Sequence, residues 1–327
     1  MQAPHSQLIS NLQAQIHDCL KDYIQPDRHL ACLDFPDIKN CGDSAIWLGQ
    51  MAYLRNWHKV QPNYISRMKD FSKSAMLKRI GDGQIFLHGG GNFGDIWLGH
   101  QKFREMVLNK LPGRQIVQFP QSIHFQSKTH LESARRAIGR HGNFVLLVRD
   151  EKSLHFAQQQ FDCVVKLCPD MAFCIGDIPT DKPSLPILAM LRQDKEKASN
   201  VAINLPSGIP CEDWMTENKM DVRRAKFSGI KSAIRDRAFS EIRLRMLNAA
   251  ANNRFQRGIK QISRAQAIVT DRLHVHICSL LIGRPHAALD NNYGKIYGFM
   301  DTFSGKTPLS HKAASLEEGI AWAQQQI

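Results

Sequence analysis

The chain has 327 residues, of which 43% are hydrophobic and 22% are charged. These proportions are ordinary for a globular protein and exclude wholesale disorder. The formal net charge is +13, which predicts attraction to an anionic partner. No apolar run reaches the length of about 18 residues that a membrane-spanning helix needs.

The length favours two domains, at about 150 residues each. Composition shifts at residues 177–186, DIPTDKPSLP, so we place the domain boundary near 177–198. We predict an N-terminal domain over residues 1–185 and a C-terminal domain over residues 186–327. Eight scattered cysteines without a C-x-x-C pair predict reduced thiols, with neither zinc nor disulfides. The N-terminus has no signal-peptide pattern, and we expect a cytoplasmic protein.

Strands and helices alternate along the chain. Residues 1–28 predict an amphipathic helix that ends before Pro26. Buried strands are predicted at 29–35, 84–87, 115–119, 143–148, 163–167, 200–205, 267–270 and 286–289. A long helical stretch is predicted within 234–265, and a closing helix over 315–327. This order is typical of α/β proteins with doubly wound parallel sheets.

A run of glycines follows the strand at residues 84–87, in the stretch QIFLHGGGNFGDIW. Gly89, Gly90 and Gly91 predict a tight turn into a helix that Asn92 or Asp95 caps. The free N–H groups of such a helix start bind phosphate or carboxylate. The alternative is a glycine turn that only links a strand to a helix, and the spacing matches neither a Walker A motif nor G-x-G-x-x-G.

The stretch TDRLHVH, residues 270–276, lies at another turn from a strand to a helix. Arg272 can donate two N–H groups to a phosphate or carboxylate, and His274 can exchange protons near neutral pH. The alternative is a salt-bridged surface turn. His274 and His276 are poor candidates for a metal pair, because positions two residues apart do not share a helix face.

Further candidates lie at other strand ends. Arg149 and Ser153 follow the strand at 143–148, and the alternative for them is a surface arginine beside an ordinary N-cap. Candidates for contacts with an acceptor substrate, such as sugar hydroxyls, are Asp43, Asp95, Gln121, Ser122, Asn291, Tyr293 and Lys295. Capping of a loop or helix is the alternative for several of them.

Six motifs occur in order between about residues 35 and 300. They are Asn40-Cys41-Gly42-Asp43, HGGGNFGD (88–95), FPQSI (119–123), VRDEKS (148–153), PDMAF (169–173) and TDRLHVHICSLLIGRP (270–285). This ordered set resembles that of the polysaccharide pyruvyltransferases.

The resemblance implies two facing Rossmann-like domains with parallel sheets, as in glycosyltransferase-B folds. It implies transfer of the enolpyruvyl group of phosphoenolpyruvate onto two sugar hydroxyls, giving a cyclic ketal and phosphate. Arg272, Leu273 and His274 match the family's Arg-Leu-His element, and Arg149 matches its first-domain arginine. We expect His274 to be the acid–base group and both arginines to hold the donor. Phosphoenolpyruvate is then a co-substrate, with neither cofactor nor metal.

The basic run at residues 219–237 matches none of these motifs. We interpret it as a solvated helix face, without the aromatic residues that base stacking needs. The net charge is consistent with an anionic acceptor, or with a peripheral contact at an anionic membrane if the saccharide is lipid-linked. A nucleotide-sugar glycosyltransferase of the same fold is one alternative function. A non-enzymatic polyanion binder is another, although we expect no nucleic acid partner.

Overall fold

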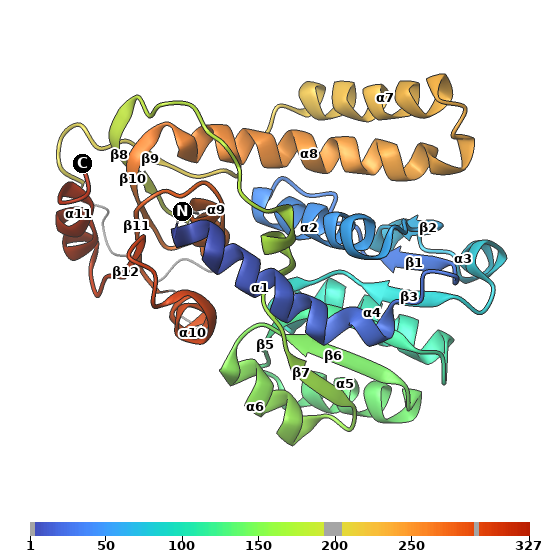
Figure 1. Cartoon of the computed structure of the whole chain (residues 1–327). Helices are drawn as coiled ribbons and strands as arrows, with labels where there is room; N and C mark the ends of the chain where they lie inside the picture. The colour runs from blue at the N-terminus through green and yellow to red at the C-terminus, as the bar shows by residue number, and fades with distance from the viewer. Residues whose placement is uncertain (1–3, 193–204, 291–293) are drawn as a thin grey trace.

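The structure is a computed structural model that describes residues 4–192, 205–290 and 294–327. These residues form one sheet of seven strands and one of five. The two sheets lie side by side, with helices packed on their faces (Figure 1). All strand pairs are parallel, which confirms the predicted α/β class.

The seven-stranded sheet is built from the first half of the chain. Its order is β2-β1-β3-β5-β6-β7, and β4 pairs with β5. The strands are β1 (Leu30–Leu33), β2 (Tyr64–Ser66), β3 (Gln84–Leu87), β4 (Gly90–Gly94), β5 (Ile116–His124), β6 (Phe144–Val148) and β7 (Val164–Leu167).

The five-stranded sheet has the order β12-β11-β10-β8-β9. Its strands are β8 (Leu185–Met190), β9 (Cys211–Glu212), β10 (Ala265–Thr270), β11 (His286–Ala288) and β12 (Ser310–Lys312). β8 therefore lies inside the segment 177–198 in which we placed the domain boundary. Pro186 falls at the exposed start of the strand, where a proline is tolerated. Of the strand predicted at 200–205, residues 200–204 lie outside the described residues.

Eleven α-helices surround the two sheets in the described residues. They are α1 (Pro4–Leu20), α2 (Cys41–His58), α3 (Lys73–Ile80), α4 (Leu98–Lys110), α5 (Lys128–His141), α6 (Glu151–Gln160), α7 (Lys219–Arg235), α8 (Ile242–Ser263), α9 (Leu273–Leu281), α10 (Lys295–Phe299) and α11 (Leu316–Gln324). Short helical turns are η1 (Lys21–Tyr23), η2 (Met68–Asp70), η3 (Met171–Ile175), η4 (Phe239–Glu241) and η5 (Met300–Ser304). None of the helices in the described ranges combines the length and apolar character needed to span a bilayer.

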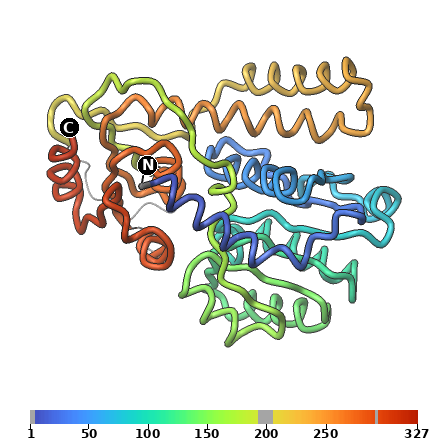
Figure 2. Tube along the Cα trace, in the orientation of Figure 1, coloured from blue at the N-terminus to red at the C-terminus, as the bar shows by residue number. Residues whose placement is uncertain are grey.

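Alternating strand residues divide the interior into layers. Leu30 and Cys32 of β1 join a core with α1, α2, α8 and α9, while Ala31 and Leu33 join a second core with α3, α4 and α5. The first core also contains Leu188 of β8, so it continues into the smaller sheet. α1 lies across the front of both halves, with the N-terminus beside the C-terminal half of the chain (Figure 2). α1 confirms the predicted opening helix in kind, although it ends at Leu20 and is followed by the short turn η1.

The structure corrects the prediction for the glycine run. Gly90 begins β4, which continues to Gly94 and pairs with β5, and the next helix, α4, begins only at Leu98. The run is therefore a strand rather than a helix start, and neither Asn92 nor Asp95 caps α4. β5 is also longer than the strand predicted at 115–119, because it continues through the FPQSI motif with a register shift between Gln118 and Gln121.

Candidate active site

A pocket of about 220 Å³ lies where the carboxyl ends of strands from both sheets meet. In parallel α/β sheets this is the usual place for a ligand. Its lining residues are Pro36, Ile38, Asn40, Asp43, His88, Gly91, Asn92, Trp97, His100, Arg149, Arg192, Trp214, Met215, Arg272, Leu273, His274 and Lys295. The pocket thus brings together the predicted residues Arg149, Arg272 and His274.

Three side chains from both halves of the chain meet at the pocket floor. Arg149 follows β6, Asp170 follows β7, and His274 lies in the first turn of α9. Nη1 of Arg149 donates to Oδ2 of Asp170 and lies 3.4 Å from Nε2 of His274. Nε2 of His274 lies 3.5 Å from the same Oδ2. The histidine therefore faces a carboxylate and a guanidinium at once.

Asp170 is almost completely buried, which by itself would raise the pKa of its carboxyl group. The charges of Arg149 and His274 outweigh that effect and hold the pKa well below its usual range. Oδ1 also accepts a hydrogen bond from the N–H of Ala172, at 2.9 Å. Asp170 is thus a fixed negative charge beneath two candidate catalytic groups.

Two glycines allow side chains to approach closely. A Cβ at Gly42, in the first turn of α2, would lie 2.5 Å from Cγ of His274. A Cβ at Gly91 would lie 3.1 Å from Nη2 of Arg149 and 3.5 Å from Nζ of Lys295. The glycines of two predicted motifs therefore leave room for the side chains of His274, Arg149 and Lys295.

Arg272 follows β10 and occupies the N-cap position of α9. Its backbone N–H donates to Oγ1 of Thr270 at 3.0 Å, and Nη2 donates to Oδ2 of Asp213 at 2.7 Å. The side chain is 2% exposed, so these contacts hold the guanidinium inside the pocket wall. Leu273 and His274 then form the start of the helix.

Other predicted residues support the pocket from behind. Gln121 donates through Nε2 to Oδ1 of Asn92 at 3.0 Å, and its Oε1 accepts from the N–H of Asn92 at 3.1 Å. Oγ of Ser122 accepts from Nε of Arg149 at 3.1 Å. These residues orient lining side chains, but neither Gln121 nor Ser122 lines the pocket itself.

Several predicted site residues lie outside the pocket lining. Oγ of Ser153 accepts from the N–H of Ile123, and Asp95 accepts from the backbone N–H groups of residues 126 and 127. Gly89 and Gly90 also lie outside the lining. Asn291 and Tyr293 lie outside the described residues, whereas Lys295 lines the pocket.

Sequence reasoning missed several lining residues. His88 directly follows β3 and His100 lies on α4, where Nδ1 contacts Oδ2 of Asp34 at 2.7 Å. Trp97 and Trp214 add aromatic walls. A strand-end position could have indicated His88, as it did for Arg149. The sequence did not indicate His100 or Trp97, because the helix that begins just after Trp97 was predicted to start at the glycines.

The imidazole of His88 is a buried neutral group. Burial, with a smaller effect of the neighbouring His100, lowers its pKa to about 3. Nδ1 lies 3.1 Å from Oε1 of Gln50, which can only accept, so Nδ1 carries the hydrogen. Nε2 has no hydrogen-bond partner among the described residues. His88 therefore lines the pocket with a buried acceptor nitrogen that has no partner among the described residues.

Asp43 is the one carboxylate among the lining residues that the structure describes. Burial raises its pKa, although His274, His100 and Arg149 act in the opposite direction. The pKa values of the Asp43 and Asp170 carboxyl groups are therefore shifted in opposite directions. In active sites such a pair separates a proton donor from a fixed charge.

The described residues contain no cluster of three or more side chains suited to a metal ion. His276 turns away from the pocket: its Nδ1 lies 2.7 Å from Nε2 of His286, and its Nε2 lies 2.8 Å from Oγ of Ser304. All eight cysteines are free.

The two parallel sheets and their helices define an α/β protein with two facing Rossmann-like domains. A solved structure of an uncharacterized protein from Klebsiella pneumoniae has the same fold, with a TM-score of 0.57 at 16% identity over 93% of this chain and 99% of that one.

Sequence comparison identifies the family. The family described as polysaccharide pyruvyl transferase matches residues 40–293. "Pyruvyl transferase 1" of Schizosaccharomyces pombe is 30% identical over 86% of this chain and 71% of its own length. "Putative pyruvyl transferase EpsO" of Bacillus subtilis is 29% identical over 88% of this chain and 89% of its own. The chain belongs to the polysaccharide pyruvyl transferase family, as its motifs predicted.

Proposed function

We propose that this transferase takes the enolpyruvyl group of phosphoenolpyruvate and forms a cyclic pyruvate ketal on two hydroxyls of a sugar. The charge of the pocket is the observation that carries the proposal. Among the described residues, the cationic side chains of Arg149, Arg192, Arg272 and Lys295 line it, against one carboxylate, that of Asp43. A small donor with a phosphate and a carboxylate matches this excess of cationic donors.

The reaction moves three protons. A proton adds to C3 of the donor, and the methylene becomes a methyl group while positive charge develops at C2. One sugar hydroxyl bonds to C2 and loses its proton, and the bond between C2 and the phosphate oxygen breaks. The second hydroxyl then bonds to C2 and also loses its proton. Of the two protons released by the sugar, one replaces the proton used at C3 and the other leaves on hydrogen phosphate.

His274 is the proposed acid–base group. The carboxylate of Asp170 faces its Nε2 and offsets positive charge on the protonated ring. Arg149 lies beside the same nitrogen, so donor anions held by Arg149 reach the histidine. Arg272 enters from the other half of the chain, and the two arginines stabilise the leaving phosphate and the donor carboxylate. The scheme assigns phosphoenolpyruvate as co-substrate and no resident cofactor.

We place the donor against the C-terminal half, beside Arg272 and Leu273, and the acceptor against the N-terminal half. Ile38 and Trp97 support the placement of the sugar on the N-terminal side of the pocket. Both residues line the pocket, and they are 46% and 37% exposed. An aromatic face beside polar groups suits a sugar ring. The acceptor is a saccharide of a polysaccharide or of its lipid-linked precursor, used on the cytoplasmic side, where free thiols persist.

The test is phosphate release from phosphoenolpyruvate with a panel of saccharides, followed by mass spectrometry of the sugars. We expect a product whose mass exceeds that of the saccharide by the mass of pyruvic acid minus one water. His274→Ala and Arg149→Ala should each abolish most turnover, and near wild-type turnover in either would remove that residue's role. Consumption of a nucleotide sugar without phosphate or ketal formation would instead favour a glycosyltransferase.

A further inference from the structure

The outer face of α7 has a composition that the pocket does not explain. α7 and α8 form a hairpin in which α8 lies against α2 and α7 is the outermost layer (Figure 1). Met220, Phe227 and Ile234 lie seven residues apart along α7 and are 51%, 57% and 51% exposed. A spacing of seven residues places them in one stripe along the helix.

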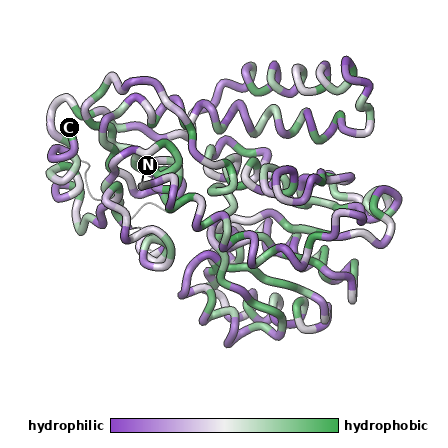
Figure 3. Tube along the Cα trace, viewed as in Figure 1, coloured by the Kyte–Doolittle hydropathy of each residue, from purple (hydrophilic) through white to green (hydrophobic). Residues whose placement is uncertain are grey.

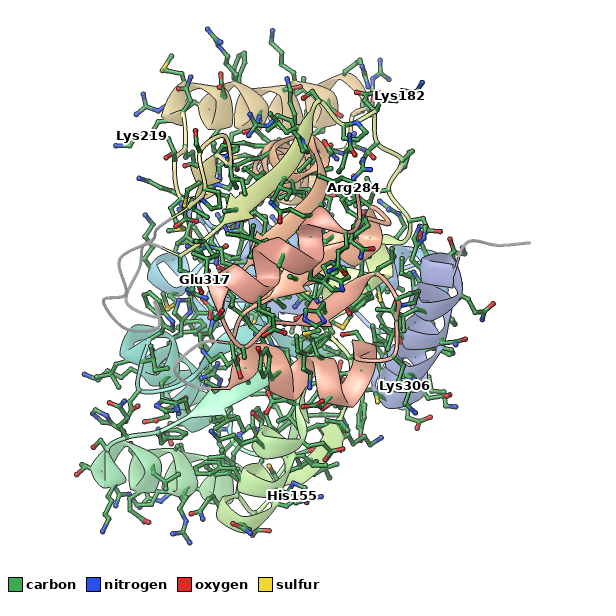
Figure 4. The ribbon with its side chains drawn as sticks, turned by 90° about the vertical axis from the view of Figure 1, so that its left-hand side faces the viewer. His155, Lys182, Lys219, Arg284, Lys306 and Glu317 are labelled. Carbon is green, nitrogen blue, oxygen red and sulfur yellow. The ribbon has the colours of Figure 1, made fainter. Side chains whose placement is uncertain are left out.

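Basic side chains flank this stripe. Lys219, Arg223, Arg224, Lys231 and Arg235 are all exposed. The acidic residues nearby are Asp221, 3.6 Å from Arg224, and Asp236, which pairs with Arg235 and Arg245. The surface is therefore apolar along its centre and positive on both sides. Figure 3 shows hydrophobic and hydrophilic turns alternating along α7, and Figure 4 shows its side chains, with Lys219 at one end, projecting from the top edge of the molecule.

We propose that this face of α7 docks onto an anionic lipid surface. Exposed apolar side chains between lysines and arginines are the pattern of helices that lie in the membrane interface. A second copy of the chain fits the face less well. A two-fold pairing of α7 with α7 would bring the same basic residues opposite each other, where like charges repel.

The face is connected to the rim of the pocket. Nζ of Lys226, on α7, donates to both carboxylate oxygens of Asp37 at 3.0 and 2.9 Å. The neighbours of Asp37 in the chain, Pro36 and Ile38, line the pocket. Trp214 and Met215 also line it, and α7 begins four residues after Met215. Docking through α7 would therefore hold the pocket rim near the lipid. The inference deepens the proposed function, since a lipid-linked acceptor is met at such a surface.

Flotation with vesicles tests the inference without donor or acceptor. Wild-type protein is mixed with vesicles of phosphatidylcholine alone, or with about one third phosphatidylglycerol. We expect binding to the anionic vesicles only, and weaker binding as salt is added. The variant Met220→Ser, Phe227→Ser, Ile234→Ser and the variant Arg223→Glu, Lys231→Glu should each bind at least about tenfold more weakly.

Matched controls carry the same changes elsewhere. Met68→Ser, Val164→Ser removes exposed apolar side chains, and Arg136→Glu, Arg140→Glu reverses charges on α5, at the opposite edge of the molecule (Figure 1). Both should bind like the wild type. Equal binding by the α7 variants and the controls would overturn the inference. A self-interface would replace it if the apolar α7 variant lost a dimer by light scattering and still bound vesicles. Turnover of a soluble saccharide should be unchanged in the α7 variants, so failure of the proposed function is seen separately.

Discussion

The carboxylate of Asp170 contacts two candidate catalytic side chains, and we predict that its charge matters more than its shape. Asp170→Asn keeps an oxygen for the N–H of Ala172 but removes the charge facing Arg149 and His274. We expect kcat for ketal formation to fall by roughly a hundredfold, as for loss of a group that supports proton transfer. Steady-state kinetics with phosphoenolpyruvate, across pH, measures this.

The matched control is Ser122→Ala, which removes only a neutral acceptor from Nε of Arg149. It should lower kcat by less than about tenfold, since the Asp170 pair still holds the arginine. Similar losses in the two variants, with unchanged pH profiles, would show that Asp170 only positions the arginine.

The acceptor nitrogen of His88 gives a second prediction. The residue is 3% exposed, and its buried Nε2 has no hydrogen-bond partner among the described residues, so we predict that a sugar hydroxyl in the pocket supplies that partner. His88→Phe should therefore raise the KM for the saccharide, or lower kcat, by about tenfold or more, because one substrate hydroxyl is left without a partner. The KM for phosphoenolpyruvate should change little. Loss of donor binding instead would place His88 on the donor side.

Single residues at strand ends could be predicted from the sequence. Arg149 and Arg272 each follow a short apolar run, and parallel strands bring such positions to one edge. Asp170 lay inside the recognised PDMAF motif, yet its role depends on contacts with Arg149 and His274 that only the three-dimensional arrangement supplies. The same is true of Gln121 and Ser122, whose side chains orient lining residues instead of lining the pocket.

The glycine run shows where local pattern fails for a whole element. Three glycines after a strand fit a turn into a helix, but the backbone of β4 instead pairs with β5. Gly94 has a φ of +123°, and a Cβ there would lie 1.7 Å from the carbonyl oxygen of His124. The glycines thus permit close packing of two strands. This packing depends on a strand residue some 30 positions away in the sequence. The local sequence pattern around the glycines therefore could not predict it.

The close contact between α2 and α9 gives a prediction about the packing of these two helices. Gly42→Ala places a methyl group 2.5 Å from Cγ of His274, so the ring must move relative to Asp170. We expect turnover to fall by about a hundredfold, since misplacement by about an ångström has that effect. Gly139→Ala is the control: it lies on α5 with no atom within 4 Å of the new Cβ, and it should leave turnover unchanged and raise stability slightly. Wild-type kcat in Gly42→Ala would contradict the packing argument.

The two halves of the molecule share one hydrophobic core and one ion-pair network. Ile46 of α2, Ile259 of α8 and Leu188 of β8 belong to the same core, so contacts join segments more than 200 residues apart. The sequence supported two Rossmann-like halves because each repeats strand and helix locally. It did not indicate how the halves are joined, because the contact is made by α8, which packs across onto α2 and follows the basic run that matched no motif.

Asp37 lies at the centre of the network that joins the halves. Its carboxylate accepts from Arg67 at 2.9 Å, from Lys226 at 2.9 and 3.0 Å, and from Arg254 at 3.0 Å. Burial alone would raise the pKa of Asp37, but these three cations outweigh it and lower the pKa from 3.8 to about 2. A carboxyl group whose pKa is lowered on folding stabilises the fold above its unfolded pKa and loses that contribution as pH falls through its folded pKa.

We therefore expect Asp37→Asn to lower the free energy of unfolding by about 1–2 kcal/mol at pH 7, allowing for partial solvent screening. The difference from wild type should shrink as pH falls from about 4 to about 2, because the wild-type carboxyl becomes protonated there and is no longer charged. Urea unfolding at a series of pH values measures both effects. Asp162→Asn, at an exposed carboxylate outside the network, should cost less than about 0.5 kcal/mol at every pH. A difference for Asp37→Asn that stayed constant down to pH 2 would mean that the amide disturbs packing and that the ion pairs contribute little to joining the halves.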